Sequence, residues 1–325
     1  MKLTIFVSKS KRLLKTVSNR RLIQWGEQYL FHPTFLQRLL SFILLPLTLV
    51  YCVIVLFKRF GVTPKRFDIP IISIGNLTLG GSGKTPTTVA LAEEYEQVAI
   101  ILRGYKRASQ GLHVVSLWGE IQCDVTISGD EAMLYASLLP KALVIVSEKR
   151  EEGIIKAQKL GARIVFLDDG FSKAHIQKLD ILIRPMPEPI NPFCLPSGPY
   201  REPKFLYKNA DLVIEEGKDF HRKTSISNPT EKMVLVTAIA NPVRLDPYLP
   251  YVVGRECYPD HHAFTQQELE KALHTHQATS ILTTRKDAVK MEQFNLPLSI
   301  LELKLDVALH VKEKITAFTK DYIVP

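Results

Sequence analysis

The feature that most limits the fold is a glycine-rich loop between an apolar stretch and a helix-forming stretch. Residues 71–86 read IISIGNLTLGGSGKTP, with glycines placed shortly before Lys84 and Thr85. Glycines let backbone N–H groups curl around phosphate oxygens without Cβ clashes, and the following helix N-terminus adds positive partial charge. This order predicts a P-loop, in which Lys84 reaches the β- and γ-phosphates of ATP and the Thr85 hydroxyl binds Mg²⁺.

One position departs from the usual P-loop pattern, which has a glycine five residues before the last glycine of the loop. Here that position is Thr78. Strand and helix still flank the loop where the pattern needs them, so a chance Gly-Lys-Thr is the weaker interpretation. The residues predicted to bind the nucleotide are Thr78, Gly80, Gly81, Ser82, Gly83, Lys84 and Thr85.

Apolar strands alternate with amphipathic stretches after Phe67. The pattern predicts strands at residues 71–74, 98–102, 143–146, 164–167 and 181–183, and helices at residues 84–96, 130–139 and 149–160. Such alternation predicts a doubly wound, mainly parallel sheet covered by helices on both faces. Ligands of such sheets bind beyond the carboxyl ends of the strands.

A Pro-rich passage from Pro185 to Pro203 separates this pattern from a second α/β pattern. The second one has strands at residues 212–214, 233–238, 281–283 and 300–305, a helix from about Thr265, and a terminal helix. We therefore predict a P-loop NTPase-type α/β fold in three parts. These are a basic N-terminal segment with an apolar helix over 1–66, a P-loop core over 67–208, and a smaller α/β domain over 209–325.

Two acids end one predicted strand of the core, where residues 163–170 read RIVFLDDG. A strand of a parallel sheet would bring Asp168 and Asp169 to the edge that carries the P-loop, where one of them would hold Mg²⁺ together with Thr85. The alternative is a turn at a strand end with two solvated acids.

Asp130 begins a predicted helix after Gly129. Taken alone, this position is more typical of a helix N-cap; the alternative is a base that accepts the proton of an attacking hydroxyl. Arg103 follows one predicted strand and Arg150 opens a helix. Phosphoryl transfer needs cations on the charge that spreads over the transferring group, so both arginines are candidate clamps, with surface salt bridges as the alternative.

The N-terminal segment carries an apolar run, residues 41–57 (SFILLPLTLVYCVIVLF), between clusters of basic residues, and Glu27 is the only acid before it. The run is at the lower limit for spanning a bilayer, and Pro46 interrupts it. Basic residues on both sides are untypical of a spanning helix. We expect a helix that dips into or lies on one leaflet; a true span and a helix buried in the protein's own core are the alternatives.

Composition supports a folded protein with an anionic partner. The 325 residues are 46% hydrophobic and 23% charged, with a net charge of +9, which is globular composition and excludes a disordered or fibrous chain. Charge alone does not choose between nucleotide, lipid and nucleic acid. The four cysteines have no metal-ligand spacing and are typical of free thiols.

Several segments together resemble the tetraacyldisaccharide 4′-kinase family of lipid A biosynthesis. They are residues 75–86 (GNLTLGGSGKTP), 103–105 (RGY), 129–131 (GDE), 148–150 (EKR), 168–171 (DDGF), 195–202 (LPSGPYRE), 241–242 (NP), 260–264 (DHHAF) and 283–289 (TTRKDAV). They occur in the family's order, and the family has Asn-Leu-Thr-x-Gly-Gly in its loop, which explains Thr78. Two places differ: Ser172-Lys173 stands where the family usually has Gln-His, and Ala132 where it has Pro.

The resemblance implies a kinase that transfers the γ-phosphate of ATP to the 4′-hydroxyl of a tetraacyl glucosamine disaccharide 1-phosphate at the cytoplasmic face of the bacterial inner membrane. ATP and Mg²⁺ are its implied cofactors, and the lipid A precursor and inner-membrane lipids its partners. Asp130 becomes the base, assisted by His261, with His262 as the alternative. The other implied roles are catalysis for Lys84, metal binding for Thr85, Asp168 and Asp169, and phosphate or substrate contacts for Arg103, Tyr105, Arg150 and Arg201.

Three other classes of protein fit less well. ATPases that position or assemble partners at membranes often have a lysine just before the Gly-Gly of the loop, where this chain has Leu79. GTPases have an Asn-Lys-x-Asp motif, which does not occur here. A nucleic-acid-binding protein would carry its excess charge on the folded domain beside stacking aromatics, whereas much of it here crowds the apolar end. We therefore expect no nucleic-acid partner.

Overall fold

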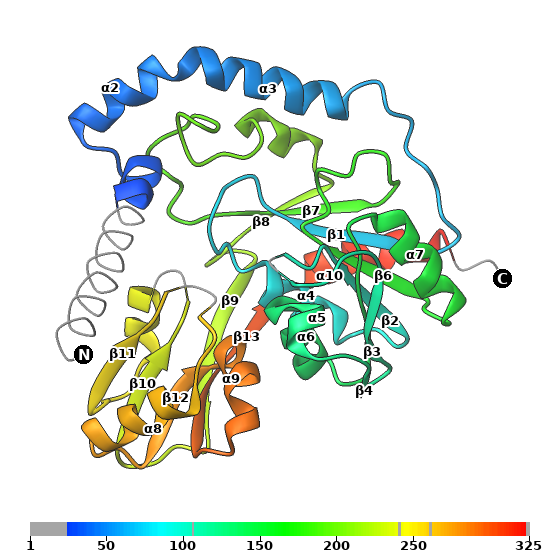
Figure 1. Ribbon diagram of the computed structural model, residues 1–325. Helices are drawn as coiled ribbons and strands as arrows, with labels where there is room; N and C mark the ends of the chain where they lie inside the picture. Colours follow the sequence, from blue (N-terminus) through cyan, green and yellow to red (C-terminus); the bar gives the residue numbers. More distant parts are fainter. Residues whose placement is uncertain (1–24, 106, 240–241, 260–261, 323–325) are drawn as a thin grey trace, which may run out of the picture. The chain divides into compact units, whose positions relative to one another are not determined.

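The computed structural model describes residues 25–105, 107–239, 242–259 and 262–322, which form two compact units (Figure 1). Of the described residues, the first unit holds 25–61 together with 77–79 and 185–207. The second holds residues 62–76, 80–184 and the chain from Lys208 onward. The middle of the glycine-rich loop, residues 77–79, therefore belongs to the first unit, while both of its ends belong to the second.

An eight-stranded sheet forms the centre of the second unit. Its spatial order is β4 (Glu120–Ile121), β3 (His113–Leu117), β5 (Leu143–Val146), β2 (Val98–Leu102), β6 (Ile164–Asp168), β1 (Ile71–Gly75), β7 (Leu179–Arg184) and β8 (Leu212–Glu215). All neighbours are parallel except β3, which is antiparallel to both β5 and β4. The expected mainly parallel α/β fold is confirmed.

Both faces of this sheet are covered, because side chains alternate between them along each strand. Ile72 and Ile74 pack in one apolar cluster with helices α4 (Lys84–Ala92), α6 (Asp130–Leu138) and α10 (Leu309–Lys320). Ile71 packs in another with helix α7 (Arg150–Lys159). A short helix, α5 (Val125–Ser128), precedes α6. The strands are thus buried on both sides, as near-continuous apolar runs predict.

A five-stranded sheet forms the rest of the second unit. Its order is β11 (Gly254–Cys257), β10 (Met233–Thr237), β12 (Ser280–Thr284), β13 (Leu298–Val307) and β9 (Phe220–Ser227), and only β9 is antiparallel to its neighbour. Helices α8 (Gln266–Thr275) and α9 (Arg285–Met291) belong to it. Thr265 and Glu268 form a capping box at the start of α8, where the sequence predicts that a helix begins.

The structure differs from the sequence pattern in a few elements. Residues 212–214, grouped by pattern with the second α/β region, lie in β8, which pairs with β7 in the first sheet. Helix α4 ends at Ala92, four residues earlier than expected. Strand β9 (FHRKTSIS) was not predicted, because an edge strand with polar, exposed side chains lacks an apolar signal.

In the first unit, residues 25–31 are helical and are followed by helices α2 (Phe35–Ile43) and α3 (Leu45–Arg59). The two helices are bent by 57° at their junction. Pro46 lies at the start of α3, and its missing N–H cannot continue the hydrogen bonds of the preceding helix. Among the described residues no single helix is long and apolar enough to cross a bilayer; α2 and α3 together reach that length and composition.

Helices α2 and α3 bury polar side chains and expose apolar ones, which is the reverse of the pattern in an ordinary soluble protein. Their buried residues are the polar Gln37, Ser41 and Thr48. Most of their apolar side chains are exposed, up to 82% for Phe57. One alternative from the sequence was a helix buried in the protein's own core through its apolar side chains. In the described residues, α2 and α3 are not buried in this way.

Polar side chains hold helix α3 and residues 25–31 against the Pro-rich passage. The Thr48 hydroxyl donates to Ser197 Oγ at 2.6 Å and accepts from the Ser197 N–H at 3.2 Å. Tyr51 donates to the Arg201 carbonyl at 2.7 Å, and Tyr29 to the Pro196 carbonyl at 3.0 Å. These contacts explain why the polar side of the helix faces inward.

Candidate active site

The glycine-rich loop connects buried strand β1 to helix α4, as predicted. Gly80 and Gly83 both have φ of +87°, a left-handed conformation that a side chain disfavours. Gly83 is the N-cap of α4, and Lys84 is its first residue. Lys84 Nζ donates to Asn76 Oδ1 at 2.9 Å. The lysine therefore reaches back across the loop to the end of β1.

The middle of the loop belongs to the first unit and pairs with the end of the Pro-rich passage. Thr78 forms a β-bridge with Tyr200, and the Leu79 N–H donates to the Pro199 carbonyl at 2.8 Å. The Arg201 N–H donates to the Leu77 carbonyl at 2.7 Å. Thr78 is thus a buried residue in a short ladder, and the nucleotide contact assigned to it stays a prediction.

The two acids lie at the same edge of the sheet as the loop. Strand β6 is the direct parallel neighbour of β1, with Asp168 opposite Ile74. The Asp169 N–H donates to the Ile74 carbonyl at 2.9 Å. Asp169 Oδ1 lies 3.9 Å from Lys84 Nζ. Lys84 and Asp169, 85 positions apart in the chain, therefore meet.

Asp168 is a buried carboxyl group whose surroundings disfavour its ionised form. Its residue exposure is 5%, and its Oδ1 atom has no hydrogen-bond partner among the described residues. Burial, followed by the negative charge of Glu131, raises the pKa of Asp168 to about 7. A buried polar oxygen without a partner is rare in proteins and requires an explanation; a cation bound there would supply one.

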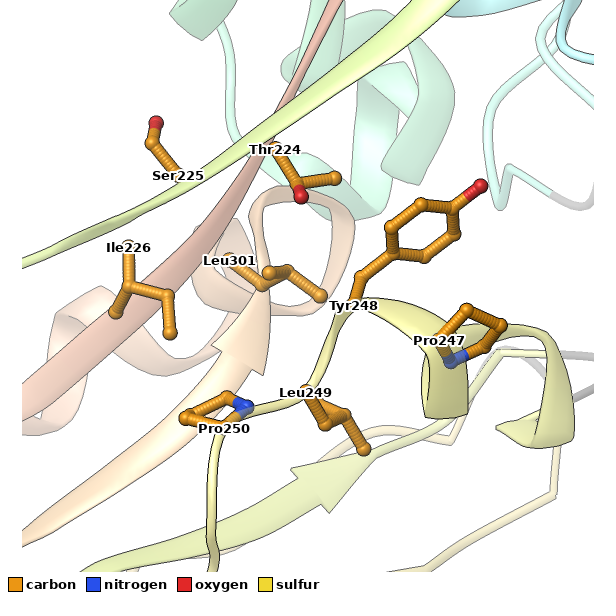
Figure 2. A pocket seen from close by; sticks show the side chains of 8 residues that line it. All are labelled: Thr224, Ser225, Ile226, Pro247, Tyr248, Leu249, Pro250 and Leu301. Carbon is orange, nitrogen blue, oxygen red and sulfur yellow. The ribbon is translucent and has the colours of Figure 1, made fainter.

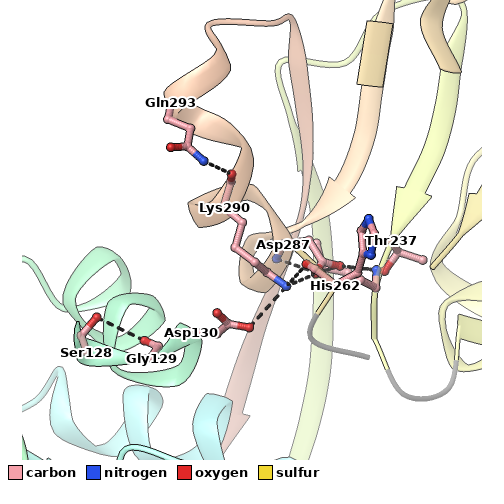
Figure 3. A network of polar contacts seen from close by, with 10 residues as sticks. Ser128, Gly129, Asp130, Thr237, His262, Asp287, Lys290 and Gln293 are labelled. Carbon is pink, nitrogen blue, oxygen red and sulfur yellow. Dashed lines mark hydrogen bonds and ion pairs between the residues drawn. The ribbon is translucent and has the colours of Figure 1, made fainter. Parts of the chain in front are cut away.

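Asp130 is the first residue of α6, whereas the N-cap is Gly129, with φ of +84°. The N-cap interpretation of Asp130 is therefore wrong. Its Oδ2 atom instead lies 3.3 Å from Lys290 Nζ. Lys290 belongs to helix α9 of the five-stranded sheet, so the ion pair joins residues that are far apart in the sequence (Figure 3).

The candidate cations have different surroundings. Arg103 and Tyr105 are exposed in the loop that follows β2. Arg150 is buried, and its guanidinium donates to the Asp168 carbonyl at 3.4 Å. Surface salt bridging, the alternative for Arg150, is therefore excluded by burial. Arg201 lies in the first unit beside residues 77–79. Phosphate or substrate contact by these four residues stays a prediction.

The histidine expected to assist the base, His261, lies outside the described residues. His262 is described: its Nε2 atom is 3.2 Å from Glu268 Oε2, and its ring stacks on Tyr258 at 4.6 Å between centroids. The His262 ring is thus engaged with the start of helix α8, while its backbone carbonyl accepts a hydrogen bond from Lys290 at 3.3 Å.

Two further cations of this region were missed by sequence reasoning. Lys290 follows the TTRKDAV segment by one residue, and only its place on helix α9 brings it to Asp130. Arg222 of β9 lies beside the glycine-rich loop, because its Nη2 atom would be 3.6 Å from a Cβ built on Gly83. A polar edge strand carries no sequence signal for such a position.

The described residues include no cluster of three or more His, Cys, Asp or Glu with the geometry of a metal site. Magnesium in phosphotransferases is commonly bound through one or two carboxylates plus substrate phosphates and waters. The oxygens of Asp168, Asp169 and Thr85 are of the kind that such an ion prefers, and Asp168 Oδ1 lacks a hydrogen-bond partner within the described ranges. The donor set therefore fits Mg²⁺.

A separate pocket of about 360 Å³ lies on the five-stranded sheet (Figure 2). It is lined by residues 224–226 of β9, residues 247–250 and Leu301 of β13. None of the candidate catalytic, nucleotide or metal residues lines it, so it is not the candidate active site.

Sequence similarity connects this chain with one family of enzymes. The sequence model of the family described as tetraacyldisaccharide-1-P 4′-kinase matches residues 40–243 and 220–323. The chain is 53% identical over 291 residues to the tetraacyldisaccharide 4′-kinase of Aliarcobacter butzleri, covering 87% of this chain and 93% of that protein. It is 50% identical over 297 residues to the tetraacyldisaccharide 4′-kinase of Helicobacter pylori, covering 91% and 95%.

One solved structure has the same fold. It is the crystal structure of LpxK from Aquifex aeolicus in complex with ATP, which aligns with a TM-score of 0.74 at 27% identity and covers 88% of this chain and 100% of the other. Family model, relatives and fold all give one result. The chain belongs to the tetraacyldisaccharide-1-P 4′-kinase family.

Proposed function

We propose that this protein transfers the γ-phosphate of ATP to the 4′-hydroxyl of a tetraacyl glucosamine disaccharide 1-phosphate, a step in lipid A biosynthesis. The observation that carries this is the arrangement of Lys84, the Asp168–Asp169 pair and Asp130 in one compact unit of a chain from this family. The relative solved with ATP supports ATP as the phosphate donor.

The geometry supports a different role for each of these residues in the reaction. In the transfer, the bond between the γ-phosphorus and the β–γ bridging oxygen breaks and a bond to the sugar O4′ forms. Asp130 receives the hydroxyl proton. Lys84 places positive charge beside the transferring group, and Arg103 and Arg201 are proposed to orient phosphates. Arg150, which is buried and bonded to the Asp168 carbonyl, orients the acid-bearing strand end.

Thr85, Asp168 and Asp169 would hold Mg²⁺. When bound, the ion would neutralise part of the phosphate charge. The raised pKa of Asp168 fits a carboxyl whose ionised form is disfavoured by burial until a positive charge arrives beside it.

The pH dependence of stability tests this carboxyl. Between about pH 4, near the ordinary pKa of aspartate, and about 7, the folded protein keeps a proton on Asp168 that the unfolded chain has released. Stability should therefore fall as pH rises across this window. Without Mg²⁺, Asp168→Asn is expected to raise the free energy of unfolding at pH 8 by roughly 2–4 kcal/mol relative to wild type.

Denaturant unfolding of both proteins from pH 4 to 8 measures this effect. Asp169→Asn is the matched control, since its side chain is 40% exposed and its ionised form remains hydrated. Equal pH slopes for wild type and Asp168→Asn would show that Asp168 does not titrate near 7.

We also propose that helices α2 and α3 attach the enzyme to the cytoplasmic face of the inner membrane. Their exposed apolar side chains and buried polar ones support this, because a large exposed apolar patch marks an interaction site. An amphiphilic substrate could then keep its acyl chains in the bilayer while its sugar enters the site.

Membrane attachment predicts a loss of vesicle binding when this face is made polar. Val50 and Phe57 are 57% and 82% exposed on α3. Since a buried side chain of this type contributes about 1.5–3 kcal/mol, Val50→Gln with Phe57→Gln should lower partition into phosphatidylethanolamine–phosphatidylglycerol vesicles by ~10-fold or more. Sedimentation measures the bound fraction. Ile155→Gln with Leu309→Gln, at 40% and 68% exposure, is the control pair. Unchanged partition of the α3 variant would contradict the proposal.

The function itself is tested by product analysis. Purified protein is incubated with Mg·ATP and either the tetraacyldisaccharide 1-phosphate, DNA, or neither, and products are identified by mass spectrometry. One added phosphate at the 4′ position of the disaccharide is expected. ATP consumption that is independent of the lipid, or stimulated only by DNA, would exclude the proposed reaction.

A further inference from the structure

The ammonium group of Lys290 is buried between two carboxylates. Its side chain is 7% exposed, and its Nζ atom lies 3.3 Å from Asp130 Oδ2 and 3.2 Å from Asp287 Oδ1. It also donates to the His262 carbonyl and lies 5.5 Å from the centre of the Phe264 ring. Figure 3 shows the contacts of Lys290 with Asp130, Asp287 and the His262 carbonyl. A buried lysine is strongly desolvated, so partners on several sides must hold it.

Asp287 anchors this lysine to the five-stranded sheet. Asp287 is fully buried, and its Oδ2 atom accepts hydrogen bonds from Thr237 Oγ1 at 2.8 Å and the Ala238 N–H at 2.9 Å. These bonds leave Oδ1 facing Lys290. The Asp287 carboxylate is thus fixed by strand β10, and it fixes the lysine on α9 in turn.

Asp130, the residue proposed as the base, lies on the other side of Lys290. Asp130 is at the first position of α6, next to a glycine in a left-handed conformation, and helices α6 and α9 pack together. The ammonium lies on the Oδ2 side of this carboxylate. Because a carboxylate rotates about two side-chain bonds, such a partner selects one orientation, and an error of about 1 Å at a reacting group can cost ~10²-fold in rate.

Given the proposed function, we propose that Lys290 is a positioning residue, which holds the Asp130 carboxylate in the orientation that receives the hydroxyl proton. The five-stranded sheet then contributes to the reaction through Asp287 and Lys290. Lys290 does not need to touch ATP or the sugar for this role.

The test separates positioning from a purely structural role. Lys290→Met leaves the buried Asp287 carboxylate without its cation, which lowers the melting temperature. The double variant Lys290→Met/Asp287→Asn removes both charges, and the asparagine keeps an oxygen for Thr237 and Ala238. The double variant should therefore regain melting temperature. If Lys290 positions Asp130, the kcat of the double variant should stay ~10–100-fold below wild type, while its KM for ATP should change little.

Two outcomes would overturn the proposal. Recovery of wild-type kcat in the double variant would mean that Lys290 only balances the charge of Asp287. A loss that appears mainly as a higher KM for ATP would mean that Lys290 contacts the nucleotide. Wild-type protein in the same assay reports on the proposed function separately. Transfer by wild type with an unaffected kcat in both variants would remove the role of Lys290 and leave the kinase assignment standing.

Discussion

Replacing Lys84 with alanine is expected to lower kcat/KM for Mg·ATP by ~10²–10³-fold, the range seen when a donor to developing transition-state charge is removed. The lysine starts helix α4 and reaches Asn76 and Asp169 at the end of the neighbouring strands. It is thereby held where the terminal phosphates would lie. Alanine keeps the helix start but removes the cation. Steady-state assays of phosphate transfer measure the loss.

The matched control is Lys149→Ala, because Lys149 is a 77% exposed lysine of the same unit, next to the start of helix α7. It should leave kcat/KM unchanged. Melting temperatures of both variants exclude a loss through unfolding. Normal turnover of Mg·ATP by Lys84→Ala would refute the phosphate-loop assignment on which the proposed mechanism depends.

The second large effect is expected for Asp130→Asn. The asparagine has nearly the same shape but cannot accept the hydroxyl proton, and general-base catalysis contributes about 10²–10⁴-fold. We expect kcat to fall by this factor, while ATP affinity, measured by calorimetry with a non-hydrolysable analogue, stays close to wild type. A fall in kcat without a change in ATP affinity indicates that the lost interaction is made in the transition state.

Asp124→Asn provides the comparison. Asp124 caps helix α5, just before α6, and its side chain accepts hydrogen bonds from Thr126 and Ile127. Its substitution weakens a cap, at a cost of about 1 kcal/mol, but should leave kcat intact. Wild-type kcat in Asp130→Asn would make Asp130 a structural partner of Lys290 and require another base.

Local patterns in the sequence were enough for most of the fold. Strands β2 and β5 have the predicted ends, and β1, β6 and β7 differ by one or two residues at an end. These elements were predictable because apolar runs, glycines and capping residues act over a few neighbouring positions. The helix predicted at residues 149–160 corresponds to α7, and Gly161, which follows its C-cap, has φ of +89°.

Long-range pairing was predictable only where a general rule covers it. The meeting of Lys84 and Asp169 followed from the rule that parallel strands end at one edge, and the structure makes β1 and β6 direct neighbours. No such rule places β8 beside β7 or β9 beside β13. These edge pairings depend on which exposed backbone is available once the central strands have packed.

The sequence by itself determined the central strands and the helices that flank them, the glycine-rich loop and the acids at its edge, because each is encoded by residues close together in the chain. Only the tertiary structure decided that Asp130 faces Lys290, 160 positions away, and that the polar side of α3 faces inward. Both depend on which surfaces pack together, of α6 on α9 and of α3 on the Pro-rich passage. Packing is a property of the whole folded chain, and no local pattern records it.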